Sequence, residues 1–239
     1  YGRREGVLVA QGARYGRLLK VHEDLFKAED VAIISAPGRS EIIGNHTDHN
    51  KGKVLAAAVN LDTLAGVSAV TVVSEGYEPI KLDLGDLEPK AEEKETSAAL
   101  IRGVADRMQQ LGYTIGGFNA AVTSDVLGGS GLSSSAAFET LICCILDTLY
   151  NDGAMDPVQR AQISQYAENV HFGKPSGLMD QMASSVGRLI GIDFRNDGPE
   201  IEPLQFSFQE HGYAMVVVNT GGSHDDLPPD FAAIREEMV

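Results

Sequence analysis

Gly128-Gly-Ser-Gly-Leu-Ser-Ser-Ser-Ala-Ala-Phe-Glu139 is the most unusual stretch of this 239-residue chain. Its glycines let the backbone approach a ligand closely, and its serines lie where an apolar helical pattern begins. The first turn of a helix offers unpaired N–H groups and the positive end of the helix dipole, which favour an anion. The stretch therefore indicates a phosphate-binding loop that opens a helix. An ordinary helix start is the alternative interpretation, because Ser and Gly are common there as well.

Two widespread phosphate-binding motifs do not describe this loop. A Walker A loop requires Gly-Lys followed by Ser or Thr, and no such triplet follows here. The dinucleotide fingerprint requires a third glycine, which is missing. The loop therefore belongs to neither class.

A second polar stretch lies upstream at residues 36–50, Ala-Pro-Gly-Arg-Ser-Glu-Ile-Ile-Gly-Asn-His-Thr-Asp-His-Asn, after a predicted buried strand. Functional side chains concentrate on loops held by a rigid scaffold. Carboxylate, amide and imidazole groups together suit the hydroxyls of a sugar. A metal site with His46, Asp48 and His49 as ligands is one alternative, and a polar turn held by Asx hydrogen bonds is the other.

A third stretch, residues 167–181, reads Ala-Glu-Asn-Val-His-Phe-Gly-Lys-Pro-Ser-Gly-Leu-Met-Asp-Gln. Its Gly and Pro residues end one predicted helix, so that Asp180 falls in the first turn of the next. A carboxylate there can accept a proton or bind a cation, and Glu168 is expected to reach the same cavity. The alternative is that both are surface or capping acids.

Around these stretches the sequence predicts helices and strands in mixed order. Amphipathic spacing predicts a helix over residues 7–27, and the charged residues 86–95 are predicted to be a solvated loop. The predicted strands are residues 31–36 (ended by Pro37-Gly38), 54–59, 64–73, 80–84, 118–123, 189–192 and 215–218. The other predicted helices are residues 97–111, the helix after the phosphate loop, 157–170, 178–186 and 232–238. Regular alternation only after residue 115 indicates an α+β fold rather than a doubly wound sheet.

Composition argues against two classes of function. The chain has 19 Lys and Arg against 34 Asp and Glu, a formal net charge of −15, whereas binding nucleic acid requires clustered basic residues. We therefore expect no nucleic-acid partner. The longest charge-free run, residues 108–124, contains two Gln, three Gly and an Asn, so we expect no membrane span.

The two cysteines, Cys143 and Cys144, are adjacent. Helical neighbours point about 100° apart, which does not suit a disulfide, and no spaced partner completes a zinc or redox motif. We expect buried thiols in a reducing, cytoplasmic compartment. The chain begins with Tyr1 and no signal segment follows, so we also expect that it starts inside a longer gene product.

The three stretches, in this order, resemble the small-molecule kinases that include galactokinase, homoserine kinase, mevalonate kinase and phosphomevalonate kinase (the GHMP kinases). Residues 38–50 resemble the mark of the galactokinase branch. The resemblance implies a GHMP-kinase-like N-terminal domain over residues 1–213, with a mixed sheet and a phosphate loop opening a helix, and the start of a second α+β domain at residues 214–239. Family members are longer and carry a glycine-rich third motif that is absent here. We therefore expect most of the second domain to be missing, and residues 1–239 alone to be inactive as a kinase.

The resemblance also implies a role for each motif residue. Asp180 would be the base beside the C1 hydroxyl of a hexose, and Arg39 would approach the transferred phosphoryl group and favour the ionised form of Asp180. Ser135 and Glu168 would hold Mg²⁺. The implied sugar-binding residues are Asn45, His46, Thr47, Asp48 and Asp180. The implied residues around the ATP phosphates are Gly129, Ser130, Gly131, Leu132, Ser133, Ser134 and Ser135.

These roles imply an ATP-dependent, galactokinase-like sugar 1-kinase that uses ATP and Mg²⁺ and has a small sugar as its partner. A catalytically silent sugar and ATP sensor of the same fold is one alternative. A metal hydrolase using His46, Asp48 and His49 is another, although the sequence offers no further ligand at typical spacing nearby.

Four positions depart from the galactokinase pattern. Asn45 stands where most galactokinases carry Glu, and Glu41 stands where they carry Asn. Leu127 stands in place of a Pro in the phosphate loop, and Phe231 in place of a sugar-contacting Tyr. The first two are either a compensating exchange or the mark of a different sugar, so the sequence does not fix the hexose.

Overall fold

The fold is organised around one long strand. The computed structural model describes residues 5–28, 30–68, 72–74, 79–196 and 198–218, and its longest strand is β2 (Lys53–Ser68). On one side β2 pairs with the antiparallel strand β1 (Ala32–Ile43). On the other side it pairs with β4 (Asn119–Ser124) through residues 63–68 and with β5 (Leu189–Asp193) through residues 53–57. β2 therefore connects segments that lie far apart in the sequence.

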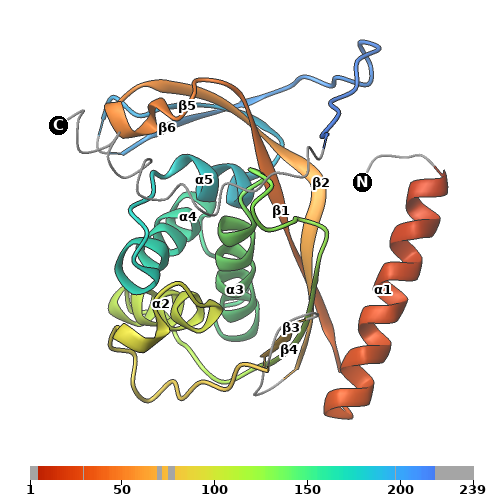
Figure 1. Cartoon of the computed structure of the whole chain (residues 1–239), viewed down its shortest axis with the longest axis vertical. Helices are drawn as coiled ribbons and strands as arrows, with labels where there is room; N and C mark the ends of the chain where they lie inside the picture. Colours follow the sequence, from red (N-terminus) through yellow and green to blue (C-terminus); the bar gives the residue numbers. More distant parts are fainter. Residues whose placement is uncertain (1–4, 29, 69–71, 75–78, 197, 219–239) are drawn as a thin grey trace.

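Two short strands extend this mixed sheet, and helices cover it unevenly. β3 (Val72–Ser74) pairs parallel with β4, and β6 (Glu200–Leu204) pairs antiparallel with β5. The resulting order is β3-β4-β2-β5-β6, with β1 beside β2. One side of the sheet carries α2 (Ser97–Gln110), α3 (Ser134–Tyr150), α4 (Pro157–Tyr166) and α5 (Met179–Val186), whereas α1 (Glu5–Phe26) lies on the other (Figure 1). This arrangement confirms the α+β fold class.

The core fixes the two helix starts that carry candidate residues. Leu141 and Ile145 of α3 are fully buried against α2 and the sheet. Met182 of α5 and Ile190 of β5 are fully buried in a second cluster. Burying an aliphatic side chain contributes roughly 1.5–3 kcal/mol, so this packing holds the first turns of α3 and α5 in place. Cys143 of α3 is a free thiol and lies in the first cluster, with Leu141 and Ile145.

The predicted break between strands 54–59 and 64–73 is wrong. Asp62 interrupts the apolar pattern there, yet Arg14 of α1 donates hydrogen bonds to its carboxylate and to its backbone carbonyl. Ser35 of β1 donates to the same carboxylate. Because the buried polar group is satisfied in this way, β2 continues through it as a single strand.

The predicted end of the first strand at Pro37-Gly38 is also wrong. β1 continues to Ile43, with a shift of register between Pro37 and Arg39, and irregularities of this kind accommodate Pro in a strand. Gly38 approaches the phosphate loop so closely that a Cβ there would lie 2.9 Å from the carbonyl oxygen of Leu132. Arg39 therefore projects from a strand rather than from a loop.

The remaining differences are local. Residues 80–84 form an isolated bridge at Ile80 rather than a strand, and residues 215–218 form neither helix nor strand. The sequence pattern misses β6, an edge strand that tolerates Pro203. The predicted helix 157–170 is α4 followed by a π-helical turn, η3 (Ala167–Phe172). The helix predicted over residues 232–238, like Phe231, lies outside the described residues.

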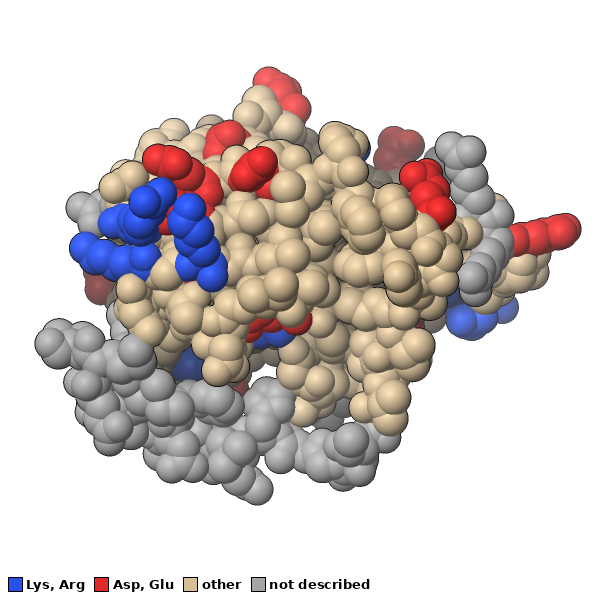
Figure 2. Space-filling view, turned by 90° about the horizontal axis from the view of Figure 1, so that it is seen from above, with Lys and Arg blue, Asp and Glu red and all other residues tan. Residues whose placement is uncertain are grey.

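The face of the molecule drawn in Figure 2 carries charges of both signs. Seen from above, most of the visible Lys and Arg side chains gather at the left beside acidic side chains, others are visible in the central hollow and at the right, and most of the remaining surface is uncharged (Figure 2). Within the described part of the chain, no helix has both the length and the apolar character needed to cross a membrane.

Candidate active site

The three sequence motifs meet at the carboxylate of Asp180. Arg39 of β1 donates from Nε to Oδ1 and from Nη2 to Oδ2 of Asp180, both at 2.8 Å. Ser133, the residue before α3, donates its Oγ proton to Oδ2 at 2.6 Å. The remaining nitrogen of Arg39, Nη1, donates to the carbonyl oxygen of Gly131 at 2.6 Å. The Asp180 side chain is 23 % exposed, so the cluster is sheltered but accessible to a ligand.

These contacts set the charge of Asp180. Burial alone would raise the pKa of this carboxyl group, but the charge of Arg39 and the hydrogen bonds from Arg39 and Ser133 outweigh burial and lower the pKa to about 2. Burial also acts against the Arg39 guanidinium, and the charge of Asp180 outweighs it, so the pKa of Arg39 is raised. At neutral pH the pair is therefore fully ionised.

The phosphate loop leaves the start of α3 open. Ser133 occupies the N-cap position with a left-handed φ of 58° and makes no side-chain capping bond, because its hydroxyl is donated to Asp180. The loop is anchored to the sheet by a hydrogen bond from the Arg39 N–H to the carbonyl of Leu132 at 3.0 Å. The first-turn N–H groups of α3 therefore remain available to an anion. Ser133 therefore does not cap α3 through its side chain.

A second polar cluster surrounds Glu168 of η3, which faces Ser135 in the first turn of α3. Ser135 donates its Oγ proton to Oε1 of Glu168 at 2.9 Å, and Lys174 contacts the same oxygen at 3.3 Å. Gln181 of α5 donates from Nε2 to Oε2 at 2.6 Å. Glu168 is only 2 % exposed. A hydroxyl and a carboxylate are the hard oxygen ligands that Mg²⁺ prefers, so the donors present here fit that ion.

Gln181 also connects Glu168 to a deeply buried acid. The Nε2 atom of Gln181 donates a hydrogen bond to Oε2 of Glu139 at 3.2 Å, and Glu139, a residue of α3, has no exposed surface. Burial, and then the charge of Glu168, raise the pKa of Glu139 well above its usual range. This environment therefore favours the neutral form of Glu139.

The polar stretch at residues 44–50 forms a turn whose most buried group points toward α5. Asp48 Oδ2 accepts a hydrogen bond from the Met179 N–H at 3.1 Å, which places this carboxylate one residue from Asp180. Asp48 Oδ1 is buried and has no hydrogen-bond partner among the described residues. Asn45 and His46 lie on the exposed rim in left-handed conformations, with φ of 53° and 57°. Thr47 donates its Oγ proton to the carbonyl of Lys53 at 3.1 Å.

The metal-hydrolase alternative finds no support in this geometry. His46 Nδ1 lies 4.0 Å from Asp48 Oδ1, and His46 is on the exposed rim. Within the described ranges, no group of three His, Cys, Asp or Glu side chains is arranged to hold a metal ion.

Sequence reasoning missed three residues of the site, Glu139, Lys174 and Gln181, and named Glu41 only as a departure from the galactokinase pattern. Glu41 accepts the His46 N–H at 3.0 Å and so shapes the turn. Gln181 directly follows Asp180, and adjacent helical side chains diverge by about 100°, so it serves the Glu168 cluster while Asp180 serves Arg39. The available signal was a lone polar residue among the buried neighbours Met179, Met182 and Ala183.

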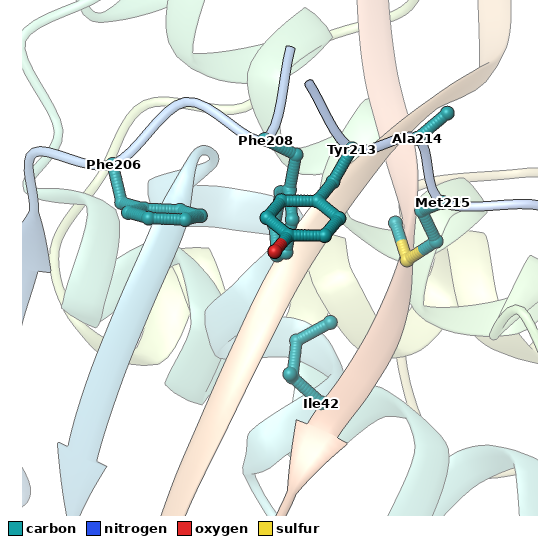
Figure 3. Close-up of a pocket in the computed structure, with 6 residues that line it drawn as sticks. All are labelled: Ile42, Phe206, Phe208, Tyr213, Ala214 and Met215. Atoms are coloured by element: carbon teal, nitrogen blue, oxygen red, sulfur yellow. The ribbon is translucent and has the colours of Figure 1, made fainter. Parts of the chain in front are cut away.

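An apolar hollow of about 450 Å³ lies beside Ile42 of β1 and the segment after β6. It is lined by Ile42, Phe206, Phe208, Tyr213, Ala214 and Met215. The aromatic side chains come from the segment after β6 and face Ile42 of β1 (Figure 3). Its lining has no charged group, so it does not resemble a site for phosphates.

Two family signatures match the chain. The signature described as "Galactokinase galactose-binding signature" matches residues 20–69, and "GHMP kinases N terminal domain" matches residues 99–188. The first includes Arg39 and Asp48, and the second includes the phosphate loop, Glu168 and Asp180. The matched ranges thus contain both polar clusters.

Known proteins of similar sequence and structure are galactokinases. The chain is 35 % identical over 158 residues to a Clostridium tetani galactokinase, covering 64 % of this chain and 40 % of the relative. It is 33 % identical over 222 residues to a Streptomyces coelicolor galactokinase, covering 89 % and 56 %. The crystal structure of Lactococcus lactis galactokinase complexed with galactose matches with a TM-score of 0.73 and 28 % identity, covering 81 % and 52 %. The chain thus spans about half the length of these relatives, and it belongs to the galactokinase branch of the GHMP kinases.

Proposed function

We propose that this chain carries the sugar- and nucleotide-binding site of an ATP-dependent kinase that phosphorylates the C1 hydroxyl of galactose. The observation that carries the proposal is the adjacency of two clusters at the start of α3. One holds Asp180 with Arg39 and Ser133, and the other holds Glu168 with Ser135. Phosphoryl transfer depends mainly on positioning and charge neutralisation, and the two clusters offer both.

In the proposed reaction each cluster has a separate task. Ionised Asp180 accepts the hydrogen bond of the C1 hydroxyl and takes its proton as the oxygen bonds to the γ-phosphorus. The bond from that phosphorus to the bridging oxygen breaks, and ADP leaves. Arg39 neutralises charge on the transferred group, and the open first turn of α3 binds the remaining phosphates. Ser135 and Glu168 would hold Mg²⁺, which would supply charge neutralisation to the nucleotide phosphates.

Sugar recognition is assigned to the turn before β2. The buried, unpartnered Oδ1 of Asp48 is a hydrogen-bond acceptor suited to a sugar hydroxyl, and Asn45, His46 and Thr47 line the rim. Galactose is the proposed sugar because the Lactococcus lactis relative was solved with galactose. We also assign residues 1–213 to an N-terminal GHMP-kinase domain. Residues 214–239 are assigned to the start of a second, C-terminal α+β domain.

Sugar-dependent ADP release by the protein made from its complete gene tests the proposal. A panel of galactose, N-acetylgalactosamine and other hexoses should show release with galactose, and phosphorus NMR should place the product phosphate on C1. Release that does not depend on a sugar, or a product phosphorylated elsewhere, would contradict the proposal.

A silent sensor of the same fold is the second candidate, and one observation favours it. The Asp180 carboxylate already accepts three hydrogen bonds, from Arg39 Nε, Arg39 Nη2 and Ser133 Oγ, which makes it a weak base. Calorimetric binding of galactose and ATP without any ADP release would identify a sensor.

A further inference from the structure

Lys174 has no role in the proposed reaction, yet its charge lies inside the site. Its Nζ is 3.3 Å from Oε1 of Glu168, and the same oxygen accepts the hydroxyl proton of Ser135 at 2.9 Å. The ammonium group thus lies beside the hydroxyl–carboxylate pair that the proposed function assigns to Mg²⁺.

The two partners of this ion pair differ sharply in burial. The Glu168 side chain is 2 % exposed, whereas that of Lys174 is 47 % exposed. A buried carboxylate needs a compensating charge, and Lys174 provides it. The N–H groups of Gly173 and Lys174 both donate to the carbonyl of Glu168, at 3.0 and 3.1 Å. The backbone of Lys174 is therefore fixed, while its long side chain reaches the solvent.

A divalent metal and Lys174 compete for Glu168. Mg²⁺ binds oxygen ligands at about 2.0–2.1 Å, so a metal on Oε1 would place a double positive charge within a few ångströms of the ammonium group. Two like charges at that distance repel strongly in a partly buried site. Metal binding therefore requires the Lys174 ammonium to leave Glu168.

The nucleotide phosphates would offer the displaced ammonium group a second negatively charged partner. Ser135 and the open first turn of α3 are the proposed position of the nucleotide phosphates, and Lys174 shares the Oε1 atom with Ser135. The ammonium group of a lysine is ordinarily charged at neutral pH, and 47 % of this side chain is exposed. The side chain thus remains charged and can pair with a phosphate.

We propose that Lys174 is a resident counter-ion of Glu168 that yields this carboxylate to the divalent metal and moves onto the phosphates of the nucleotide. The inference rests on the proposed function, because it assigns metal and nucleotide to the same site. Lys174 then weakens the binding of the divalent metal and strengthens the binding of the nucleotide.

Lys174→Met separates these effects in two titrations of the 239-residue chain. Mn²⁺ titrated alone, with free Mn²⁺ followed by electron paramagnetic resonance, should bind about threefold to tenfold more tightly than to the wild type, because its competitor is removed. MgATP measured by calorimetry should bind about tenfold more weakly, because a charged phosphate contact is lost. Galactose affinity should not change, and Lys174→Arg should restore most of the MgATP affinity.

Lys90→Met is the matched control. It removes a lysine that pairs with Asp86 at 3.0 Å outside the site, so the net charge changes equally and both affinities should match the wild type. Unchanged Mn²⁺ affinity in Lys174→Met, or unchanged MgATP affinity beside tighter Mn²⁺ binding, would overturn the inference alone. A wild-type chain that binds neither MgATP nor galactose would instead contradict the proposed function, and this inference with it.

Discussion

Two carboxyl groups of the site are driven toward opposite protonation states by their neighbours. Asp180 has a pKa of about 2 because Arg39 and Ser133 stabilise its charge against the effect of burial. Glu139 is completely buried and contacts no cation among the described residues, so burial and then the charge of Glu168 raise its pKa. Environments that separate the pKa values of neighbouring acids are typical of functional sites.

Asp180→Asn tests the proposed base. Because Asn cannot take the hydroxyl proton, turnover of the protein made from its complete gene should fall by roughly 10²–10⁴-fold, while ATP affinity barely changes. Asp193→Asn is the control, since Asp193 pairs with Arg195 and Lys53 outside the site. Turnover of Asp180→Asn within a few-fold of the wild type would remove Asp180 from the mechanism.

Glu139→Gln tests the raised pKa through stability. The folded protein keeps the Glu139 proton, whereas the unfolded chain releases it above the ordinary value of 4.5. Wild-type stability should therefore decrease as the pH rises above 4.5, because the folded state then binds more protons. Glu139→Gln has no proton to release, so urea denaturation should show it to be more stable than the wild type at pH 8 and equally stable near pH 4. The same difference at both values of pH would show that folding does not raise the pKa of Glu139.

At the scale of elements, the π-helical turn η3 positions Glu168 by close packing against α2. A Cβ on Gly103 of α2 would lie 2.7 Å from the Cα of Ala167 and 3.0 Å from Cδ2 of His171. His171 in turn contacts Asp106 of α2 through Nε2 at 3.0 Å. Inserted π-helical turns are frequent at functional sites, and this one places a carboxylate opposite the start of α3.

Gly103→Ala should therefore disturb both stability and the Glu168 cluster. The added methyl group meets backbone atoms that cannot move aside, and overpacking of this kind costs about 1–3 kcal/mol. Thermal unfolding should show a lowered Tm, and Mn²⁺ affinity should fall with it. Gly12→Ala is the matched control, because Gly12 lies in α1 with nothing within 4 Å of an added Cβ, and it should stabilise the helix by about 0.5–1 kcal/mol. An unchanged Tm in Gly103→Ala would show that α2 and η3 are not closely packed.

Much of this architecture could be predicted from local patterns, and the exceptions have tertiary causes. Helices α2, α3 and α5 follow the apolar spacing of the sequence because their buried faces decide their ends. β2 could not be recognised as one strand, because Asp62 is acceptable there only when Arg14 of α1 reaches it. The continuation of β1 through Pro37-Gly38 also depends on a tertiary contact, because the N–H of Arg39 donates a hydrogen bond to the carbonyl of Leu132 in the phosphate loop.

The candidate site, like the fold, could be predicted from local sequence patterns only in part. The three motifs and their order could be read from the sequence, and the structure brings Arg39, Ser133 and Asp180 into contact. Their roles stay predictions. No role could be assigned to Gln181 and Lys174 from the sequence, because their roles depend on contacts with Glu168, which lies on a neighbouring element.

At the scale of the whole molecule, apolar surface remains around the segment that follows β6. Tyr213, Val216 and Val218 are 68 %, 76 % and 73 % exposed, and Ile43 at the end of β1 is 68 % exposed. The apolar hollow shown in Figure 3 belongs to the same region. Contiguous exposed apolar surface usually marks an interaction face. The sequence-based expectation that residues 1–239 alone lack kinase turnover stays a prediction, which ADP release by this chain would contradict.

The 239-residue chain on its own should self-associate through this surface, because association removes apolar area from water. Sedimentation velocity over a range of concentrations should show a rising average mass. The double variant Val216→Ser and Val218→Ser should remain monomeric to higher concentration. Val9→Ser is the matched control, since Val9 is 68 % exposed on α1, across the sheet from the other helices (Figure 1); it should associate like the wild type. A wild-type chain that sediments as a monomer at every concentration would show that this surface is not an interaction face.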